Sequence, residues 1–260
     1  MEDTNKVIFA GAGPGDPELI TVKAMNALKT SDLIIYAGSL VPEAVLCWKG
    51  EKTKTVSSQD MDLTQIIDTI RKYYSMGQKI IRLHTGDPAL YGAIFEQMRE
   101  LEKYDIPYEV IPGVTAAFAA SAKMKMEYTL PEETQTLILT RVSGRTPVPD
   151  SEDLEKLASH KSSLVIYLSI GHAKKVQSIL ETHYGKDSLC AVAFKVSHPE
   201  EKIIYTKIKH LLKTCEENQI TRHALIIVGK SVEASINPGH VLSSKLYDPG
   251  FSHEYRTAQK

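Results

Sequence analysis

Short apolar runs alternate with stretches of helical periodicity over the first half of the chain. The apolar runs predict β-strands at Val7–Ala10, Leu33–Tyr36, Thr53–Val56, Lys79–His84 and Tyr108–Ile111. Between and after them, the apolar spacing predicts helices at Pro17–Thr30, Pro42–Trp48, Leu63–Met76, Gly92–Lys103 and Thr115–Lys123. Regular alternation of this kind is typical of an α/β fold in which helices cover both faces of a mostly parallel sheet.

The second half of the chain has a different pattern. It predicts strands at Thr136–Arg141, Leu164–Ser169, Leu189–Lys195, Lys202–Thr206 and Ala224–Val228, with helices at Ser151–Ser159, Gly171–His183 and Ile208–Glu217. Lys202–Thr206 follows the preceding strand too closely for a helical crossover, so this sheet is expected to be partly antiparallel, that is, mixed.

The change of pattern predicts two α/β lobes. Pro112-Gly113 and Pro131-Glu132-Glu133 interrupt the elements between them, so we place an N-terminal domain at residues 1–115 and a C-terminal domain at 116–260. Clefts between domains are favoured ligand sites, and we expect the ligands to lie between the two lobes.

The most informative single segment is the loop Gly11-Ala12-Gly13-Pro14-Gly15-Asp16-Pro17, directly after the first predicted strand. It departs from the dinucleotide fingerprint Gly-x-Gly-x-x-Gly because Asp16 stands where the third glycine belongs. A carboxylate at a helix N-terminus would repel a phosphate, so we expect a ligand other than a dinucleotide. Asp16 followed by Pro17 is also a helix start signal, which makes a purely structural capping role the alternative.

Three further loops follow predicted strands, at His84–Gly92, Pro112–Ala117 and Tyr167–Gly171. Ligands of open α/β sheets bind outside the carboxyl ends of the strands, where such loops converge. Taken singly, each loop is as well explained by an ordinary turn. Asp87 with Pro88 is again a capping signal, and the small residues after Thr115 are equally suited to a tight helix–sheet contact.

Other chemistries find little support. The second strand ends at Tyr36-Ala37-Gly38-Ser39 without the acid that holds a nicotinamide ribose, which argues against an NAD(P) oxidoreductase. No HExxH or GxSxG motif occurs, and the three cysteines lack CxxC spacing, so we expect no protein-bound metal and reduced thiols. A net charge of −1 gives no global attraction to nucleic acid or membranes. Without a leader or a membrane-length apolar run, the expectation is a soluble, cytoplasmic protein of 260 residues.

A basic segment follows the first strand of the second half. Arg141 and Arg145 lie in Arg-Val-Ser-Gly-Arg-Thr-Pro-Val-Pro, where guanidinium groups are suited to bind carboxylates. A plain solvated loop is the alternative.

Together these loops resemble the signatures of the tetrapyrrole methylase family, which methylates uroporphyrinogen and corrin precursors with S-adenosylmethionine. The resemblance is carried by Val7–Thr21, by Gly86-Asp87-Pro88 with Tyr91-Gly92, and by Pro112-Gly113-Val114-Thr115-Ala116. Four other segments resemble the branch that methylates C-11 of precorrin-4, with the cobalt-containing form closer: Tyr36–Val41, Leu139–Pro147, Ile166–Ile170 and Leu246–Arg256.

The resemblance implies a homodimer of two-lobed chains that bind S-adenosylmethionine between the lobes. By motif match, the cofactor contacts are Pro14, Gly86, Asp87, Leu90, Thr115, Ala116, Leu168, Ala193, His223 and Ala224. It further implies a cobalamin-pathway substrate. We hypothesise that Arg141, Arg145 and Lys195 bind the acetate and propionate carboxylates of this substrate and that Asp16 orients its ring. The alternatives are another corrin-ring or uroporphyrinogen methyltransferase, an RNA- or protein-modifying relative, and a non-catalytic corrinoid carrier.

Overall fold

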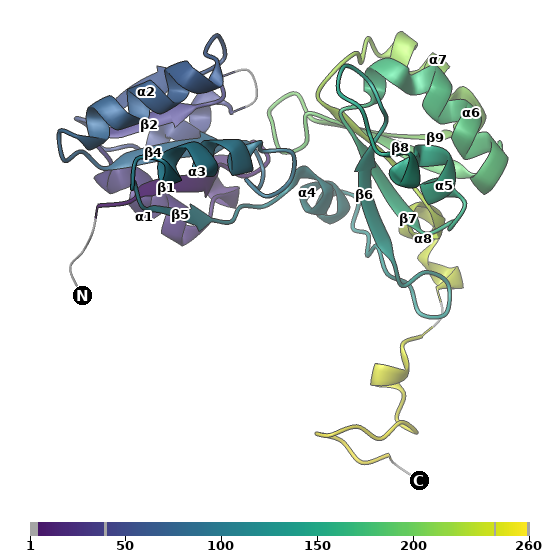
Figure 1. Ribbon diagram of the computed structural model, residues 1–260. Coiled ribbons are helices and arrows are strands. Elements are labelled where there is room, and N and C mark those ends of the chain that lie inside the picture. The colour runs from purple at the N-terminus through teal and green to yellow at the C-terminus, as the bar shows by residue number, and fades with distance from the viewer. Residues whose placement is uncertain (1–4, 39–40, 242, 259–260) are drawn as a thin grey trace. The chain divides into compact units, whose positions relative to one another are not determined.

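The computed structural model describes residues 5–38, 41–241 and 243–258, which form two units. Unit 1 is Met1–Ala119 together with Ser197–Pro199, and unit 2 is Ala120–Val196 together with Glu200–Lys260 (Figure 1). The division at Ala119 falls within helix α4 (Ala116–Lys123), beyond the boundary predicted after residue 115. Ser39 and Leu40 of the quoted Tyr36–Val41 segment lie outside the described residues.

Unit 1 is built on the parallel sheet that the alternating pattern predicts. Its strands run in the order β3-β2-β4-β1-β5, and every pair is parallel. Their bounds are β1 Val7–Gly11, β2 Leu33–Tyr36, β3 Lys54–Ser57, β4 Ile80–His84 and β5 Tyr108–Ile111. All five are within a residue or two of the predicted strands.

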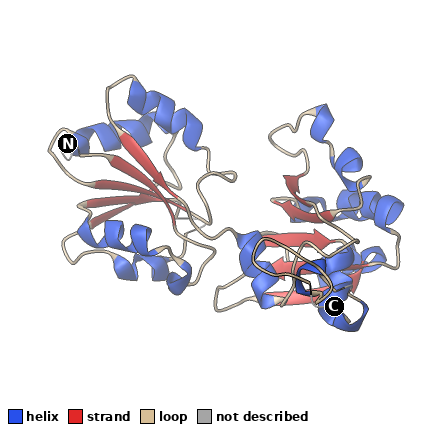
Figure 2. Ribbon diagram, turned by 90° about the horizontal axis from the view of Figure 1, so that it is seen from below, coloured by secondary structure: helices blue, strands red, loops and turns tan. Residues whose placement is uncertain are grey.

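Helices cover both faces of this sheet (Figure 2), which is why its strands read as continuous apolar runs. Phe9, Leu33 and Ile35 are buried with side chains of α2 (Leu63–Tyr74) and α3 (Ile94–Glu102). Ile34 and Leu83 point to the other face and are buried with α1 (Val22–Thr30) and the 3-10 helix η2 (Glu43–Trp48). The predicted helix Pro42–Trp48 is therefore a 3-10 helix.

The predicted helix Pro17–Thr30 is broken into two pieces. Asp16 caps the short 3-10 turn η1 (Pro17–Leu19) by accepting a hydrogen bond from the Glu18 N–H at 2.9 Å. Ile20 is extended, and α1 begins only after Thr21, whose hydroxyl accepts from the Ala24 N–H. Threonine is a good N-cap, so the second start signal overrides the continuous periodicity.

Unit 2 contains a mixed sheet in the order β6-β7-β10-β8-β9. The strands are β6 Leu137–Arg141, β7 Ser163–Tyr167, β8 Leu189–Phe194, β9 Lys202–Lys207 and β10 Ala224–Val228. Only β6 and β7 pair in parallel; the β8–β9 pair is antiparallel, which confirms the prediction from its short connection.

Side chains of α5 Leu154–Ala158, α6 Ala173–Tyr184 and α7 Leu211–Glu217 are buried with those of the sheet in a second apolar core, to which the 3-10 turns η4 Ile170–His172 and η5 Ile208–His210 also contribute. Unit 2 also contains α8 Lys230–Ile236 and the 3-10 turns η3 Asp150–Glu152, η6 Pro238–His240 and η7 Lys245–Tyr247. Helix α8 was not predicted. It starts after Gly229, at φ 131°, and is tied to β7 by a buried contact of 3.0 Å between the Ser163 and Ser231 hydroxyls.

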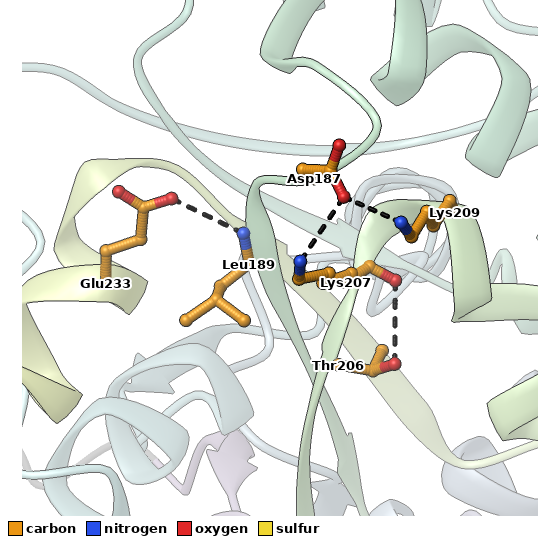
Figure 3. A network of polar contacts seen from close by, with 6 residues as sticks. All are labelled: Asp187, Leu189, Thr206, Lys207, Lys209 and Glu233. Atoms are coloured by element: carbon orange, nitrogen blue, oxygen red, sulfur yellow. Dashed lines mark hydrogen bonds and ion pairs between the residues drawn. The ribbon is translucent and has the colours of Figure 1, made fainter.

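Polar contacts fix one end of the β8–β9 pair (Figure 3). The Asp187 carboxylate accepts hydrogen bonds from Lys209 at 2.7 Å and Lys207 at 3.3 Å, which hold its pKa below the usual range. Glu233 of α8 accepts the Leu189 N–H at 3.4 Å. The candidate site residues on β8 lie at the opposite end of that strand.

Candidate functional site

Three loops of unit 1 meet at the carboxyl ends of β4, β1 and β5, which are neighbours in the sheet. Gly13 and Gly86 form an isolated antiparallel bridge, in which the Gly86 N–H donates to the Gly13 carbonyl at 2.8 Å. The Ala12 N–H donates to the His84 carbonyl at 2.7 Å. The first and second predicted ligand loops are thus joined by backbone hydrogen bonds.

The approach of these loops is so close that it requires glycine. A Cβ atom on Gly11 would lie 2.6 Å from both the Gly86 carbonyl oxygen and the Gly113 Cα. A Cβ atom on Gly113 would overlap the same Gly86 carbonyl and lie 2.8 Å from the Gly11 Cα. One glycine from each loop therefore contributes to a backbone-lined cradle, where a ligand can approach the main chain directly.

Asp87 links the second loop to the third. Its Oδ1 accepts the Ala89 N–H at 2.7 Å, and its Oδ2 accepts the Gly113 N–H at 2.9 Å. The carboxylate is half-buried and caps the turn from Pro88 to Tyr91, whereas α3 begins later, at Ile94. Each oxygen keeps a further lone pair, so the group can hold the loops and still face a cationic ligand.

The other predicted cofactor residues of unit 1 lie in the same three loops. Pro14, Gly86 and Thr115 are buried, and Leu90 and Ala116 are half-buried. Tyr91 and Ala93 close the second loop with positive φ angles of 57° and 49°. Left-handed conformations in non-glycine residues cost about 1 kcal/mol or more each, so the loop's shape is imposed by its surroundings.

Asp16 has a structural role that the sequence also predicted. Besides capping η1, its own N–H donates to the Ser197 hydroxyl at 2.9 Å. His198 packs so closely on Gly15 that a Cβ there would overlap its imidazole. Nothing in the sequence pattern indicated that Ser197–Pro199 would pack against this loop, because the segment lies between two strands of the other half.

In unit 2, the predicted site residues gather at one edge of the sheet. Arg141 ends β6 and pairs in register with Tyr167 at the end of β7, next to Leu168. Strand β10 runs in the opposite direction, so its start at Ala224 lies beside Phe194 at the end of β8. The Lys195 N–H donates to the His223 carbonyl at 2.9 Å. Ala193 and Ala224 are buried at the same edge.

Three of these residues have strained backbones. Leu168, Lys195 and His223 have positive φ angles of 52°, 43° and 56°, and the Leu168 side chain is 66% exposed. Such conformations gather at binding sites, where the surrounding structure imposes them. An exposed leucine in a strained turn is poorly explained by folding alone, which favours a contact with a ligand.

The basic side chains at this edge of the sheet differ in their hydrogen-bond and ion-pair partners. Arg141 Nη1 donates to the Thr146 carbonyl at 3.0 Å, and Nη2 donates to the Pro147 carbonyl at 2.8 Å, so Arg141 folds its own loop. Arg145 is exposed on that loop. Lys195 Nζ lies 2.9 Å from a Glu200 carboxylate oxygen.

Two buried polar residues of β4 had no signal in the sequence, because they occupy positions of an apolar strand. Arg82 and His84 are each 5% exposed on the face covered by α2 and α3. Burial and the neighbouring Arg82 charge lower the pKa of His84 to about 3, so its imidazole is neutral. The ring stacks on Phe9 at 6.0 Å between centroids.

This histidine predicts a pH dependence of stability. His84 binds a proton with a pKa of 6.5 in the unfolded chain but with a pKa of about 3 in the folded chain. The free energy of unfolding therefore falls as the pH drops from 6.5 towards 3. Between pH 7 and pH 5, we expect His84 to account for a loss of about 2 kcal/mol in the free energy of unfolding. Urea denaturation of wild type and His84→Phe at both pH values measures it; equal losses in the two proteins would contradict the assignment.

The described residues include no cluster of three or more His, Cys, Asp or Glu side chains that could hold a metal ion. Nor does any helix within this part of the chain have the length and apolar character needed to cross a membrane.

The sequence model of a family described as Tetrapyrrole (Corrin/Porphyrin) Methylases matches residues 6–212. The chain belongs to the tetrapyrrole methylase family. A relative from Methanocaldococcus jannaschii, a cobalt-precorrin-4 C(11)-methyltransferase, is 46% identical to this tetrapyrrole methylase over 261 residues, covering 100% of the chain and 99% of the relative. A precorrin-4 C(11)-methyltransferase from Pseudomonas aeruginosa is 41% identical over 254 residues, covering 97% and 99%.

The fold of this tetrapyrrole methylase is also that of a solved relative. The crystal structure of a cobalt precorrin-4 methyltransferase, a cobalamin biosynthetic enzyme, superposes with a TM-score of 0.85 at 39% identity, covering 87% of this chain and 95% of the relative. The predicted two-lobed α/β class, with a mostly parallel and a mixed sheet, is confirmed.

Proposed function

We propose that the protein transfers a methyl group from S-adenosylmethionine to C-11 of precorrin-4, in its cobalt-containing form, during cobalamin biosynthesis. Relatives of this activity align over 97–100% of the chain at 41–46% identity. Because the relatives' names include both cobalt-containing and metal-free substrates, use of the cobalt form, and hence of the anaerobic route, is the finer part of the proposal.

The observation that carries the cofactor proposal is the glycine cradle closed by Asp87. The loops Gly11–Asp16, Thr85–Gly92 and Pro112–Ala117 contain no lysine or arginine, so nothing in them neutralises a phosphate. A half-buried carboxylate beside bare backbone instead suits a cation without phosphate, as S-adenosylmethionine is. When bound, that cofactor supplies an electrophilic methyl group.

Further cofactor contacts are proposed in both units. In unit 1 they are Pro14, Gly86, Asp87, Leu90, Thr115 and Ala116; in unit 2 they are Leu168, Ala193, His223 and Ala224. The strained turns at Leu168 and His223 support their inclusion. Methyl transfer is an in-line displacement, so correct positioning of the two reactants supplies much of the rate acceleration.

For the substrate, we propose that Arg145 and Lys195 bind the acetate and propionate carboxylates, and that Arg141 shapes the loop that presents Arg145. Guanidinium and ammonium groups are good carboxylate partners. Asp16 remains proposed as a ring-orienting residue, since only its Oδ1 is used by the cap on Glu18.

The two arginines predict separable effects. Arg145→Ala should raise the KM for the tetrapyrrole about tenfold while the loop stays folded. Arg141→Ala should raise that KM and also make the segment between Val142 and Pro147 sensitive to protease, because three carbonyl contacts are lost. Steady-state kinetics with limited proteolysis measures both, and an unchanged KM in Arg141→Ala would contradict its role.

We also propose that the protein forms a homodimer and is located in the cytoplasm. The same proposal includes no nucleic-acid partner, no membrane partner and no protein-bound metal. They rest on the family resemblance and on the near-neutral charge. Sedimentation equilibrium tests the dimer.

The substrate proposal is tested by release of S-adenosylhomocysteine with three candidates: cobalt-precorrin-4, metal-free precorrin-4 and uroporphyrinogen III. We expect the highest kcat/KM with cobalt-precorrin-4. Preference for uroporphyrinogen III would favour the alternative family activity, and pigment binding without product would indicate a non-catalytic carrier.

A further inference from the structure

Arg82 carries a buried positive charge that finds no carboxylate partner within ion-pair distance among the described residues. It lies on β4 in register with Phe9 of β1 and Ile35 of β2, on the face that α2 and α3 cover and that it shares with the buried His84. Burial lowers its pKa to about 10, so the guanidinium is still charged at neutral pH. Burying a charge without a partner costs desolvation free energy, so an anion that binds the Arg82 guanidinium would compensate that cost.

The guanidinium is held in a fixed orientation. Its Nε donates to Gln97 Oε1 at 3.1 Å, and Nη1 donates to the Ile35 carbonyl at 3.3 Å. Gln97 is fixed in turn, because its amide donates to the Ala93 carbonyl at 3.1 Å. Within the described parts of the chain, the donors of Nη2 have no acceptor. Two of the five guanidinium N–H groups therefore donate to the protein, and both N–H groups of Nη2 are left for a ligand.

Arg82 lines a cavity of about 320 Å³ within unit 1. Polar lining comes from Ser58 and Gln59, which follow β3. The first turns of α2 and α3 contribute apolar and polar positions, among them Leu63, Ile66 and Glu96. The positive ends of two helix dipoles thus adjoin the same cavity, and they add to the attraction of a buried guanidinium for an anion.

We propose that this cavity, called here the Arg82 cavity, binds a carboxylate, and that the carboxylate is an acetate or propionate side chain of the tetrapyrrole substrate. Carboxylates accept hydrogen bonds from a guanidinium edge with charge assistance, and the bound anion compensates the buried charge. The identity of the carboxylate's source rests on the proposed function; the binding of a carboxylate does not.

Two residues at the cavity predict opposite effects. Glu96 is exposed and carries a like charge, so Glu96→Gln should tighten carboxylate binding about fivefold. Gln59 is exposed and neutral, so Gln59→Glu should weaken it by about the same factor. Neither side chain lies in a core, so both variants should fold. Glu100→Gln makes the same charge change one turn along α3, outside the cavity lining, and should bind as wild type does.

The test titrates the full chain with uroporphyrin III, a stable and fluorescent tetrapyrrole octacarboxylate, and with its methyl ester. Arg82→Met, which keeps the volume and removes the charge, should bind the acid at least about tenfold more weakly, and no variant should change ester binding. If Arg82→Met does not fold, Gln59→Glu and Glu96→Gln carry the test alone. Affinities for the acid within about twofold of wild type in all variants would overturn the proposal.

Two further measurements are made. Competition by free propionate tests whether the carboxylate comes from the substrate, and a methyl-transfer assay tests the proposed function separately from the Arg82 cavity. Free propionate that competes weakly, only at millimolar concentrations, supports the substrate side chain; free propionate that saturates the Arg82 cavity at micromolar concentration overturns that assignment. Methyl transfer to cobalt-precorrin-4 is measured in parallel. If wild type transfers no methyl, the proposed function fails while carboxylate binding is judged by the titration. If it does, unchanged affinities in the variants overturn the cavity proposal alone.

Discussion

The Asp87→Asn variant will bind S-adenosylmethionine about a hundredfold more weakly than wild type. The substitution removes a negative charge that we place beside the cofactor's positive sulfur. In the wild type, each Asp87 carboxylate oxygen accepts a backbone hydrogen bond, from the Ala89 and the Gly113 N–H. In the variant, the asparagine NH2 group replaces one of these oxygens, so one backbone N–H faces another donor and loses its acceptor. Isothermal titration calorimetry with S-adenosylmethionine and S-adenosylhomocysteine measures the loss.

The comparison between these two ligands separates charge from loop geometry. S-adenosylhomocysteine lacks the positive charge, so the variant should lose less affinity for it than for S-adenosylmethionine. Asp68→Asn is the matched control, because Asp68 is an exposed acid on α2 whose partner is Arg71. A wild-type dissociation constant in Asp87→Asn would refute the cofactor site as we place it.

The Gly113→Ala variant will lose about 3 kcal/mol of unfolding free energy, and it will no longer bind the cofactor measurably. The added methyl group meets backbone atoms of Gly86 and Gly11 rather than the end of a flexible side chain. The third loop must therefore move away from the other two, and the Asp87 hydrogen bond to its N–H is broken. Urea denaturation and calorimetry measure the two effects.

Gly171→Ala provides the matched control for this prediction. Gly171 also follows a strand of an α/β unit, but a Cβ there would meet nothing within 4 Å. Its φ is not in the left-handed region, so the variant should be as stable as wild type or slightly more stable. Equal stability of the Gly113 and Gly171 variants would show that the glycine cradle does not depend on close approach.

Most strands could be predicted because burial on both faces makes them continuous apolar runs, as at Leu33–Tyr36. The first residue of a helix is harder to predict where the sequence contains two possible N-caps close together. The periodicity from Pro17 to Thr30 is unbroken, yet Thr21 begins a new helix after Asp16 has capped a 3-10 turn. Helix α8 was not predicted because it is short and begins directly after Gly229, a residue that the sequence pattern indicates only as a break.

The site was predictable to the extent that it consists of loops after strands. Gly11, Gly86 and Gly113 could be assigned to neighbouring strand ends, but their backbone contacts depend on the strand order, which the sequence does not state. The role of Arg141 in folding its own loop and the packing of Ser197 against Asp16 depend on side-chain placement. Arg82 and His84 lie in a strand that is buried throughout, and the sequence pattern does not indicate that these two polar side chains are buried as well.

The central claim is methyl transfer to one ring carbon, and its most direct test follows that carbon. Cobalt-precorrin-4 is incubated with the protein and S-adenosylmethionine carrying a ¹³C-labelled methyl group, and the product is located by mass spectrometry and NMR. We predict one labelled methyl group per ring, attached to C-11, together with an equal amount of S-adenosylhomocysteine. A label at any other carbon, or no label at all, would contradict the account.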